Sequence, residues 1–216
     1  TMAASANAVI YAGAKPVFVD SELDTWNMDI SKIEAKITPN TKAIMIVHTY
    51  GHPIDMDRVN EIANKHNLFV IEDAAEAHGA EINKKKVGGL GDAGVFSFYG
   101  NKIITSGEGG MITTDDKELY KKMRYLRDHA MSKEKRYWHT EVGFNYRMTN
   151  LQAALGVAQF ERIDELIDRK RLIFSFYKKR LNEIDGIKLN KEADWAKSIY
   201  WMSSIFLEKD FGISRN

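Results

Sequence analysis

The sequence predicts an α/β fold with a mostly parallel sheet, and two observations lead to this prediction. Continuous apolar runs at Ala43–Val47 and at residues 68–71 are typical of strands that are covered on both faces. Between them, Met56–His66 carries apolar residues at helical spacing. Strands that alternate with helices in this way build βαβ units, in which the strands run parallel.

The segments before this unit are expected to be short. Ala3–Tyr11 is rich in alanine and is expected to form a helix that Gly13 ends. Residues 15–19 (Lys-Pro-Val-Phe-Val) form a brief β-type run. Asp29 can cap a helix that continues to about Ile37.

The segments after it change character. Residues 93–98 and 110–114 are expected to be strands, and residues 99–109 between them form a loop rich in small and polar residues. Residues 117–129 are amphipathic and should be helical. Residues 131–142 are charged and aromatic, which indicates a surface loop.

A long helical pattern covers residues 149–183. An uninterrupted helix of that length would measure about 50 Å, so it either bridges two domains or bends. A new strand-bearing region follows Gly186. We therefore expect a large domain at residues 1–185 and the start of a small α/β domain at residues 186–216.

Composition excludes several classes of function. The 216 residues carry a formal net charge of +1, so no overall field favours nucleic acid or an anionic membrane as a partner. There is no cysteine, which removes disulfides, thiolate metal sites and cysteine nucleophiles and favours a cytoplasmic setting. We expect no metal site. No segment is long and apolar enough to span a membrane, and the start does not resemble a signal peptide.

Asp73 stands where a predicted buried strand ends. In open α/β sheets, ligands bind beyond the carboxyl ends of the strands. A carboxylate at this place can be partly desolvated and still meet a cationic group of a ligand. The alternative is that Asp73 caps a following helix, and this segment alone leaves both interpretations open.

Lys102 follows an aromatic β-type run and precedes three closely spaced glycines. A lone lysine is most often a solvated surface charge, but glycines let the backbone approach a ligand or adopt positive φ. Ser97 lies five residues earlier and can offer its hydroxyl to an anion. A nucleotide P-loop is excluded, because the lysine comes before the glycines and no GxxxxGK[ST] pattern exists.

Asn145 and Arg147 lie just before the long helical pattern, whose N-cap is Thr149 or Asn150. Both side chains could face an anion near the start of that helix. The alternative is that they only fix the conformation of their own loop.

Lys102, Asp73 and Ser97 together suit one chemistry. An amine nucleophile forms an imine with an aldehyde cofactor. Pyridoxal 5′-phosphate (PLP) then acts as an electron sink, and its pyridine nitrogen needs a carboxylate to stay protonated. Its phosphate needs hydroxyl and amide donors.

Four ordered motifs strengthen this interpretation. They resemble the DegT/DnrJ/EryC1/StrS family, which comprises PLP-dependent nucleotide-sugar aminotransferases of the aspartate-aminotransferase fold (PLP transferase type I). The likeness covers essentially the whole chain, from residues 12–17 to residues 212–215. The motifs are residues 72–79 (Glu-Asp-Ala-Ala-Glu-Ala-His-Gly), 96–102 (Phe-Ser-Phe-Tyr-Gly-Asn-Lys), 107–111 (Gly-Glu-Gly-Gly-Met) and 145–154 (Asn-Tyr-Arg-Met-Thr-Asn-Leu-Gln-Ala-Ala).

The resemblance implies a role for each matching residue. Lys102 corresponds to the catalytic Schiff-base lysine and Asp73 to the partner of the pyridinium nitrogen. Glu76 matches a position beside the cofactor ring, where many relatives have Gln. Ser97 matches a phosphate ligand. Asn145 matches the phosphate ligand that the neighbouring subunit donates, which implies a homodimer with shared active sites.

The resemblance also implies substrates. Two of the motifs and residues 48–53 (His-Thr-Tyr-Gly-His-Pro) are most similar to the branch that aminates C4 of GDP-4-keto-6-deoxymannose, with glutamate as amino donor. One branch of the family has histidine in place of the Schiff-base lysine and dehydrates the sugar at C3. Lys102 argues against membership of that branch. Two alternatives stay open: the same chemistry on a UDP- or dTDP-linked 4-keto-6-deoxysugar, or an inactive fragment with this fold.

The chain departs from the family at both ends. Family members are longer, and their Gly-Thr pair that binds the PLP phosphate would lie upstream of Thr1. The C-terminal small domain also continues further in the family. We therefore expect this chain to be part of a longer protein, with half of the phosphate site in the missing part.

Overall fold

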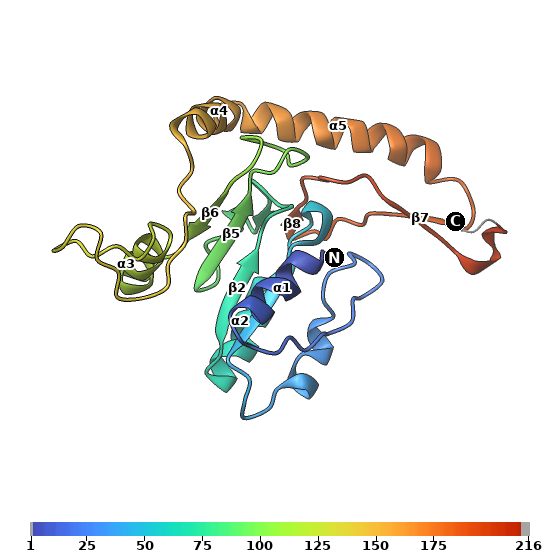
Figure 1. Cartoon of the computed structure of the whole chain (residues 1–216). Coiled ribbons are helices and arrows are strands. Elements are labelled where there is room, and N and C mark those ends of the chain that lie inside the picture. Colours follow the sequence, from blue (N-terminus) through green and yellow to red (C-terminus); the bar gives the residue numbers. More distant parts are fainter. Residues whose placement is uncertain (1, 213–216) are drawn as a thin grey trace.

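A four-stranded sheet forms the centre of the computed structural model, which describes residues 2–212 (Figure 1). The strand order is β1-β2-β5-β6. The first three strands are parallel, and β6 runs antiparallel to β5. The strands are β1 (Ala43–Val47), β2 (Phe69–Asp73), β5 (Ala93–Ser97) and β6 (Gly110–Thr113).

The predicted βαβ unit is confirmed. β1 and β2 pair in parallel through Val47 and Asp73, and α2 (Met56–His66) connects them. Asp55 caps α2, since its side chain accepts the N–H of Arg58, and Asn67 ends the helix in the left-handed conformation. Burial alternates along β1 and β2 rather than being complete, so one face is closed and the other is half-buried.

Two expectations near the N-terminus are wrong in detail. α1 (Ala3–Tyr11) forms as predicted, but residues 15–19 pair with no strand and remain extended, with Val17 and Phe18 exposed. Pro16 lacks an N–H to donate, and the run pairs with neither edge strand of the sheet, β1 or β6. Asp29 does act as a cap, but of two short 3₁₀ helices, η1 (Ile30–Lys32) and η2 (Glu34–Lys36), instead of one long helix.

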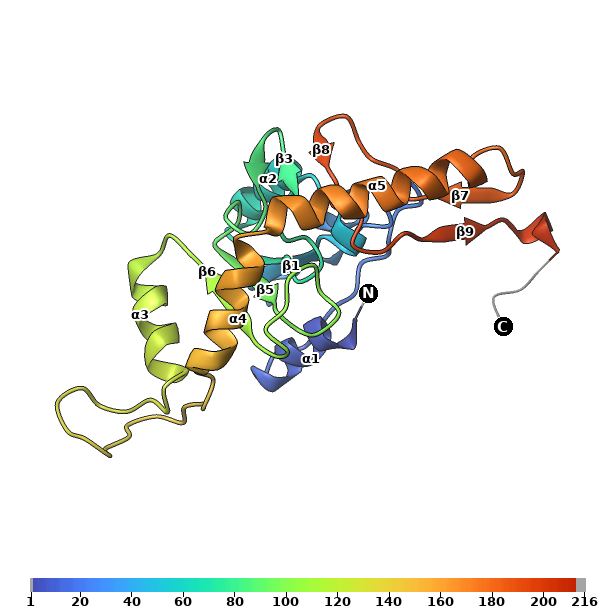
Figure 2. The same cartoon turned by 90° about the horizontal axis from the view of Figure 1, so that it is seen from above.

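The long helical pattern bends, which was one of the two alternatives. It forms α4 (Asn150–Phe160) and α5 (Ile163–Leu181), separated at Arg162, whose φ of −109° and ψ of 11° lie outside the helical range. α5 then runs above the rest of the chain toward β7 (Figures 1 and 2). The predicted helix before it is α3 (Lys117–Leu126), and the loop that follows extends away from the sheet.

The C-terminal residues form several short elements. β7 (Ile187–Leu189) pairs with β9 (Ile205–Leu207) in an antiparallel hairpin beyond α5, and η4 (Lys209–Phe211) follows. Between β7 and β9 the chain returns to the sheet-bearing part. There β8 (Ala196–Lys197) pairs with β3 (Glu81–Ile82), which also pairs with β4 (Lys85–Lys86).

The segment after β8 contributes to the main core. Ile199 and Trp201 are buried in the same cluster as Ile44, Ile46 and Val59. Residues 196–201 are thus packed against the predicted large domain, while the boundary near Gly186 stays a prediction. The stretch at residues 213–215 that resembles the family lies outside the described residues. No helix in the described part is long and apolar enough to cross a bilayer.

Candidate active site

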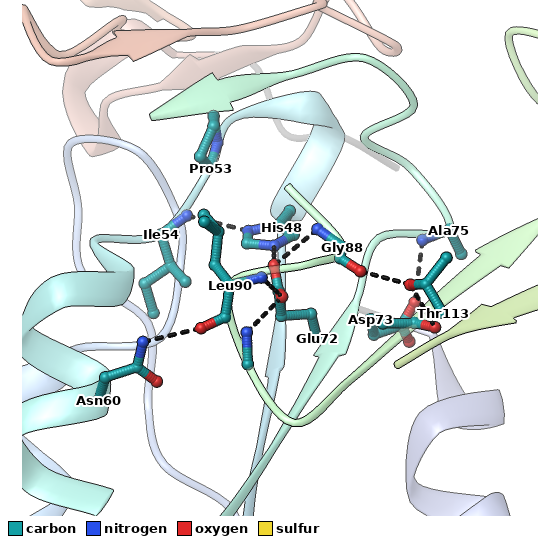
Figure 3. Close-up of polar contacts among 12 residues, drawn as sticks. His48, Pro53, Ile54, Asn60, Glu72, Asp73, Ala75, Gly88, Leu90 and Thr113 are labelled. Atoms are coloured by element: carbon teal, nitrogen blue, oxygen red, sulfur yellow. Dashed lines mark hydrogen bonds and ion pairs between the residues drawn. The ribbon is translucent and has the colours of Figure 1, made fainter. Parts of the chain in front are cut away.

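A fully buried carboxylate, that of Glu72, lies beside the carboxyl end of β2 (Figure 3). Its side chain accepts four hydrogen bonds, from Nε2 of His48 at 3.1 Å and from the backbone N–H groups of Gly88 at 2.7 Å and of Leu90 and Gly91 at 2.6 Å. These donors saturate the carboxylate, as burial of such a group requires. Glu72 therefore ties the turn at residues 88–91 to the strand.

The proton between His48 and Glu72 can be assigned. Nδ1 of His48 accepts the N–H of Ile54 at 3.2 Å, so the ring proton is on Nε2 and points to Glu72. Burial alone would raise the pKa of Glu72, but the hydrogen bonds from His48 and from the backbone at Gly88 and Gly91 outweigh it. The pKa of Glu72 consequently lies below its ordinary value.

The turn that holds Glu72 needs glycine at residue 88. Gly88 has a φ of +88°, and a Cβ there would lie 2.2 Å from the ring of Phe96. Any side chain would force apart the turn and β5, and with them the donors around Glu72.

Asp73 points to the other side of β2 (Figure 3). Oδ1 accepts the N–H of Ala75 at 3.1 Å, and Oδ2 accepts the hydroxyl of Ser5 from α1 at 2.7 Å. A turn rather than an α-helix follows, so Asp73 is not the cap of a helix there. Within residues 2–212 no lysine, arginine or histidine pairs with this carboxylate, so its charge is met by neutral donors alone.

Glu76 lies three residues further on and is buried. Oε2 accepts the N–H of Tyr50 at 2.9 Å, and Tyr50 itself has a strained φ of +54°. Burial raises the pKa of Glu76, Lys102 lowers it and Asp73 raises it. Lys102 and Asp73 therefore both lie close enough to Glu76 to act on its charge, so three of the predicted residues share one neighbourhood.

Lys102 lies in the loop between β5 and β6, at residues 98–109. The loop is closed by the N–H of Phe98, which donates to the carbonyl of Gly109 at 2.8 Å, and by the N–H of Lys102, which donates to the carbonyl of Tyr99 at 3.0 Å. Gly109 has a φ of +134°, and a Cβ there would lie 2.7 Å from Cε of Met148. The glycine-rich stretch thus supplies positive φ and close approach, as predicted from its sequence.

The ammonium group of Lys102 lies 4.2 Å from the centroid of the Trp201 ring. The indole N–H of Trp201 donates to the carbonyl of Asn101, the residue before the lysine, at 2.9 Å. Sequence reasoning missed Trp201, which is about 100 positions away and carries no local signal.

Ser97 is the last residue of β5 and is paired with Gly110 of β6. Its Oγ accepts the N–H of Tyr99 at 3.3 Å. No hydrogen-bond acceptor for the hydroxyl of Ser97 is found in the described part of the chain, so its O–H can serve a ligand.

Asn145 lies in the segment between α3 and α4. Its backbone bridges to Asp128 beyond α3, and its side chain is exposed. Arg147 forms an ion pair with Asp128 at 3.5 Å. Thr149, not Asn150, is the N-cap of α4, and it forms a capping box with Gln152.

His78 is a second residue that sequence reasoning did not single out. Its ring lies 5.4 Å and 5.9 Å from the rings of Phe96 and Phe98, centroid to centroid. Burial lowers its pKa to about 4, so the imidazole is neutral near pH 7. Neither ring nitrogen has a hydrogen-bond partner among residues 2–212.

Comparison with known proteins gives consistent results. The sequence model of the DegT/DnrJ/EryC1/StrS aminotransferase family matches residues 1–216. Two proteins named GDP-perosamine synthase are each 51% identical to this chain. The one from Escherichia coli O157:H7 aligns over 95% of this chain and 56% of its own length, and the one from Caulobacter vibrioides over 100% and 58%. The chain therefore spans somewhat more than half the length of these curated relatives.

Solved structures agree. PseC of Helicobacter pylori, an aminotransferase involved in the biosynthesis of pseudoaminic acid, has a TM-score of 0.92 at 30% identity and covers 98% of this chain and 57% of its own. DesV of S. venezuelae, crystallised with a ketimine intermediate, has a TM-score of 0.91 at 35% identity, with 97% and 56% covered. These matches confirm the predicted fold class.

Proposed function

Because this chain belongs to the DegT/DnrJ/EryC1/StrS aminotransferase family, we propose that it is the central part of a PLP-dependent sugar aminotransferase. The enzyme moves an amino group from glutamate to C4 of a nucleotide-linked 4-keto-6-deoxyhexose. The names of the relatives at 51% identity support GDP-4-keto-6-deoxymannose as substrate and GDP-perosamine as product. We also propose a cytoplasmic setting, with which the absence of cysteine is compatible.

One observation carries this proposal: Lys102 and Asp73 both influence the pKa of Glu76, so the three side chains lie near one another at the carboxyl end of β2. The donor set fits PLP. When bound, PLP supplies an electrophilic aldehyde and a pyridinium ring that withdraws electrons. Asp73, which meets only neutral donors in the described structure, is suited to hold the pyridinium N–H and keep that nitrogen charged.

The other residues complete the proposed assignment. Lys102 is the nucleophilic amine and the base that moves the substrate proton. Ser97 donates its free hydroxyl hydrogen to the cofactor phosphate. Glu76 lies beside the ring, and its raised pKa makes it easier to protonate than an ordinary glutamate.

We also propose that the active protein is a homodimer with shared sites. Asn145 is exposed, and its backbone bridges to Asp128 beyond α3. The helix that follows, α4, has no buried residue although Leu151, Val157 and Phe160 are apolar. A second subunit would cover this surface and receive Asn145 as a phosphate ligand.

The Lys102→Ala variant of the full-length protein tests the proposal. Transamination should fall by far more than tenfold, because both the nucleophile and the base are lost. In the wild-type protein, borohydride reduction followed by peptide mass spectrometry should find the cofactor attached at Lys102. Lys65→Ala is the matched control, since Lys65 is an exposed lysine paired with Glu34, and it should leave activity unchanged. Cofactor attached to another lysine would refute the assignment.

A further inference from the structure

Trp201 contacts the candidate catalytic lysine in two independent ways. Its ring lies under the ammonium of Lys102, 4.2 Å from nitrogen to centroid. Its indole N–H donates to the carbonyl of Asn101 at 2.9 Å. The first contact fixes the end of the lysine side chain, and the second fixes the backbone just before it.

Trp201 is itself held firmly. It is 6% exposed and belongs to the main hydrophobic core. Nζ of Lys170, on α5, donates to its carbonyl at 3.1 Å. Its ring lies 6.5 Å from that of Tyr50, whose N–H donates to Glu76. An aromatic ring fixed in this way is a rigid support, because few of its own rotamers remain accessible.

The segment that carries Trp201 is anchored at the residues just before the ring. The N–H of Ile199 donates to the carbonyl of Gly51 at 3.0 Å, and the hydroxyl of Ser198 donates to the same carbonyl at 3.2 Å. Arg171 donates to the carbonyl of Ser198. The C-terminal part of the chain thus packs against the core and places the indole of Trp201 beside Lys102.

The face of an indole attracts a cation more strongly than the face of any other side chain. The Lys102 ammonium in this loop is therefore attracted to the ring and is kept from swinging into solvent. A lysine that acts alternately as nucleophile and as base needs such a fixed resting place, because a small misplacement of a reacting group lowers the rate strongly.

We propose that Trp201 is a positioning residue for Lys102, which holds the free ammonium on its face and fixes the preceding backbone through Asn101. The catalytic consequence rests on the proposed function, whereas the contact itself does not.

The contact is tested by chemical labelling of lysines in the full-length protein freed of PLP. Acetylation by N-hydroxysuccinimide acetate is followed by peptide mass spectrometry in wild type, Trp201→Met and Trp201→Phe. Methionine is apolar and flexible but has no aromatic face, so Lys102 should react on the order of three- to tenfold faster. Phenylalanine keeps a weaker face and should give a smaller increase.

Lys135 provides the matched control. Its ammonium lies 4.3 Å from the ring centroid of Trp138, in the exposed loop after α3. Trp138→Met should accelerate the labelling of Lys135 and leave Lys102 unchanged, whereas Trp201→Met should do the reverse. Lys102 labelling within error of wild type in folded Trp201→Met would overturn the proposal.

Trp201→Met could fail to fold because the residue is in the core, so thermal unfolding is measured first. In that case Trp201→Phe and Trp201→Tyr carry the test, since both have a weaker face and no indole N–H. The proposal then requires Lys102 to react roughly twofold faster in both, and an unchanged rate in both overturns it.

Two measurements on the PLP-loaded protein separate positioning from general damage. Trp201→Met should lower kcat more than it changes the KM for glutamate, and Trp201→Phe should restore part of kcat. If the two variants lost the same amount of kcat and the same amount of stability, the role of Trp201 would be purely structural, which would contradict the proposal. Cofactor attached to a lysine other than Lys102 would refute the proposed function, while the labelling result would still stand.

Discussion

The strand-end region around Glu72 and the region from α3 to α4 are organised in opposite ways. At the strand end, a buried carboxylate accepts four hydrogen bonds, all from the same chain. In the second region, neither α3 nor α4 has a buried residue, although both are rich in apolar side chains. Leu151, for example, is 86% exposed.

The difference separates what one chain completes from what it leaves open. The strand-end region satisfies the Glu72 carboxylate internally and holds Asp73, Glu76 and Lys102. The α3 to α4 region holds Asn145 and presents an uncovered apolar surface of the kind that marks an interaction site. Under the proposed function, the first region supplies the chemistry and the second contributes to the site of the neighbouring subunit.

Mixed dimers test this division most directly, and they should give the largest effect. We expect full-length Lys102→Ala and Asn145→Ala subunits to be weak when each is alone. If Asn145 works in the neighbouring site, a mixed dimer collects both defects in one site and leaves the other intact. Roughly half of the wild-type activity per mixed dimer should then return.

The control for this experiment is physical evidence of the mixed dimer, obtained with two different affinity tags and purification on both. If Asn145 works within its own chain, every site keeps one defect and no activity returns. No recovery in confirmed mixed dimers would remove the shared site and leave the assignment of Lys102 untouched.

Glu72→Ala should produce the next largest effect, a loss of stability. It leaves the N–H of His48 and three backbone N–H groups without an acceptor in the core. Removal of one partner from a buried pair of this kind costs about 3–5 kcal/mol. Chemical denaturation of the full-length protein measures the loss. Glu34→Gln, at an exposed pair with Lys65, is the control and should change little.

The buried pair of Glu72 and His48 also predicts a pH dependence of stability. The pKa of Glu72 is lower in the folded chain than its ordinary value of 4.5, so its contribution to stability is complete above that value. The contribution is lost as the pH falls toward and through the lowered pKa, because the unfolded chain takes up the proton more readily than the folded chain. Wild-type stability should therefore drop more steeply below pH 4.5 than that of Glu72→Gln. Parallel curves for the two proteins would show that Glu72 is not the group responsible.

The sequence was sufficient where the signal was local. Apolar runs and helical spacing predicted β1, α2 and β2, and the position of Asp73 at the end of β2 followed from them. The glycines after Lys102 indicated a loop with positive φ, which the structure has at Gly107 and Gly109. Each of these features depends on neighbours within a few residues.

Features that depend on distant contacts were not predictable. Residues 15–19 have strand-like composition, but a strand forms only with a partner strand, and in the described part of the chain they pair with none. Trp201 meets Asn101 and Lys102 only because the chain after β8 returns to the core. For Asn145 the decisive contact would be made by another subunit, so neither the sequence pattern nor a single chain can provide it, and its role rests on the family resemblance.

Asp73→Asn should have the smallest of these effects in free energy, and it contrasts with its neighbour Glu72. Asp73 accepts two hydrogen bonds from neutral donors at the carboxyl end of β2, and asparagine can still accept one of them. Stability should therefore change little and some PLP should stay bound. An amide cannot hold a pyridinium charge, so kcat should fall on the order of 10²-fold.

The comparison needs steady-state kinetics and thermal unfolding on the same full-length samples, with Glu72→Ala measured beside it. We expect one variant to lose stability and the other to lose turnover, although the two residues are adjacent. Near-normal turnover in Asp73→Asn would mean that another carboxylate, with Glu76 the nearest candidate, faces the cofactor nitrogen.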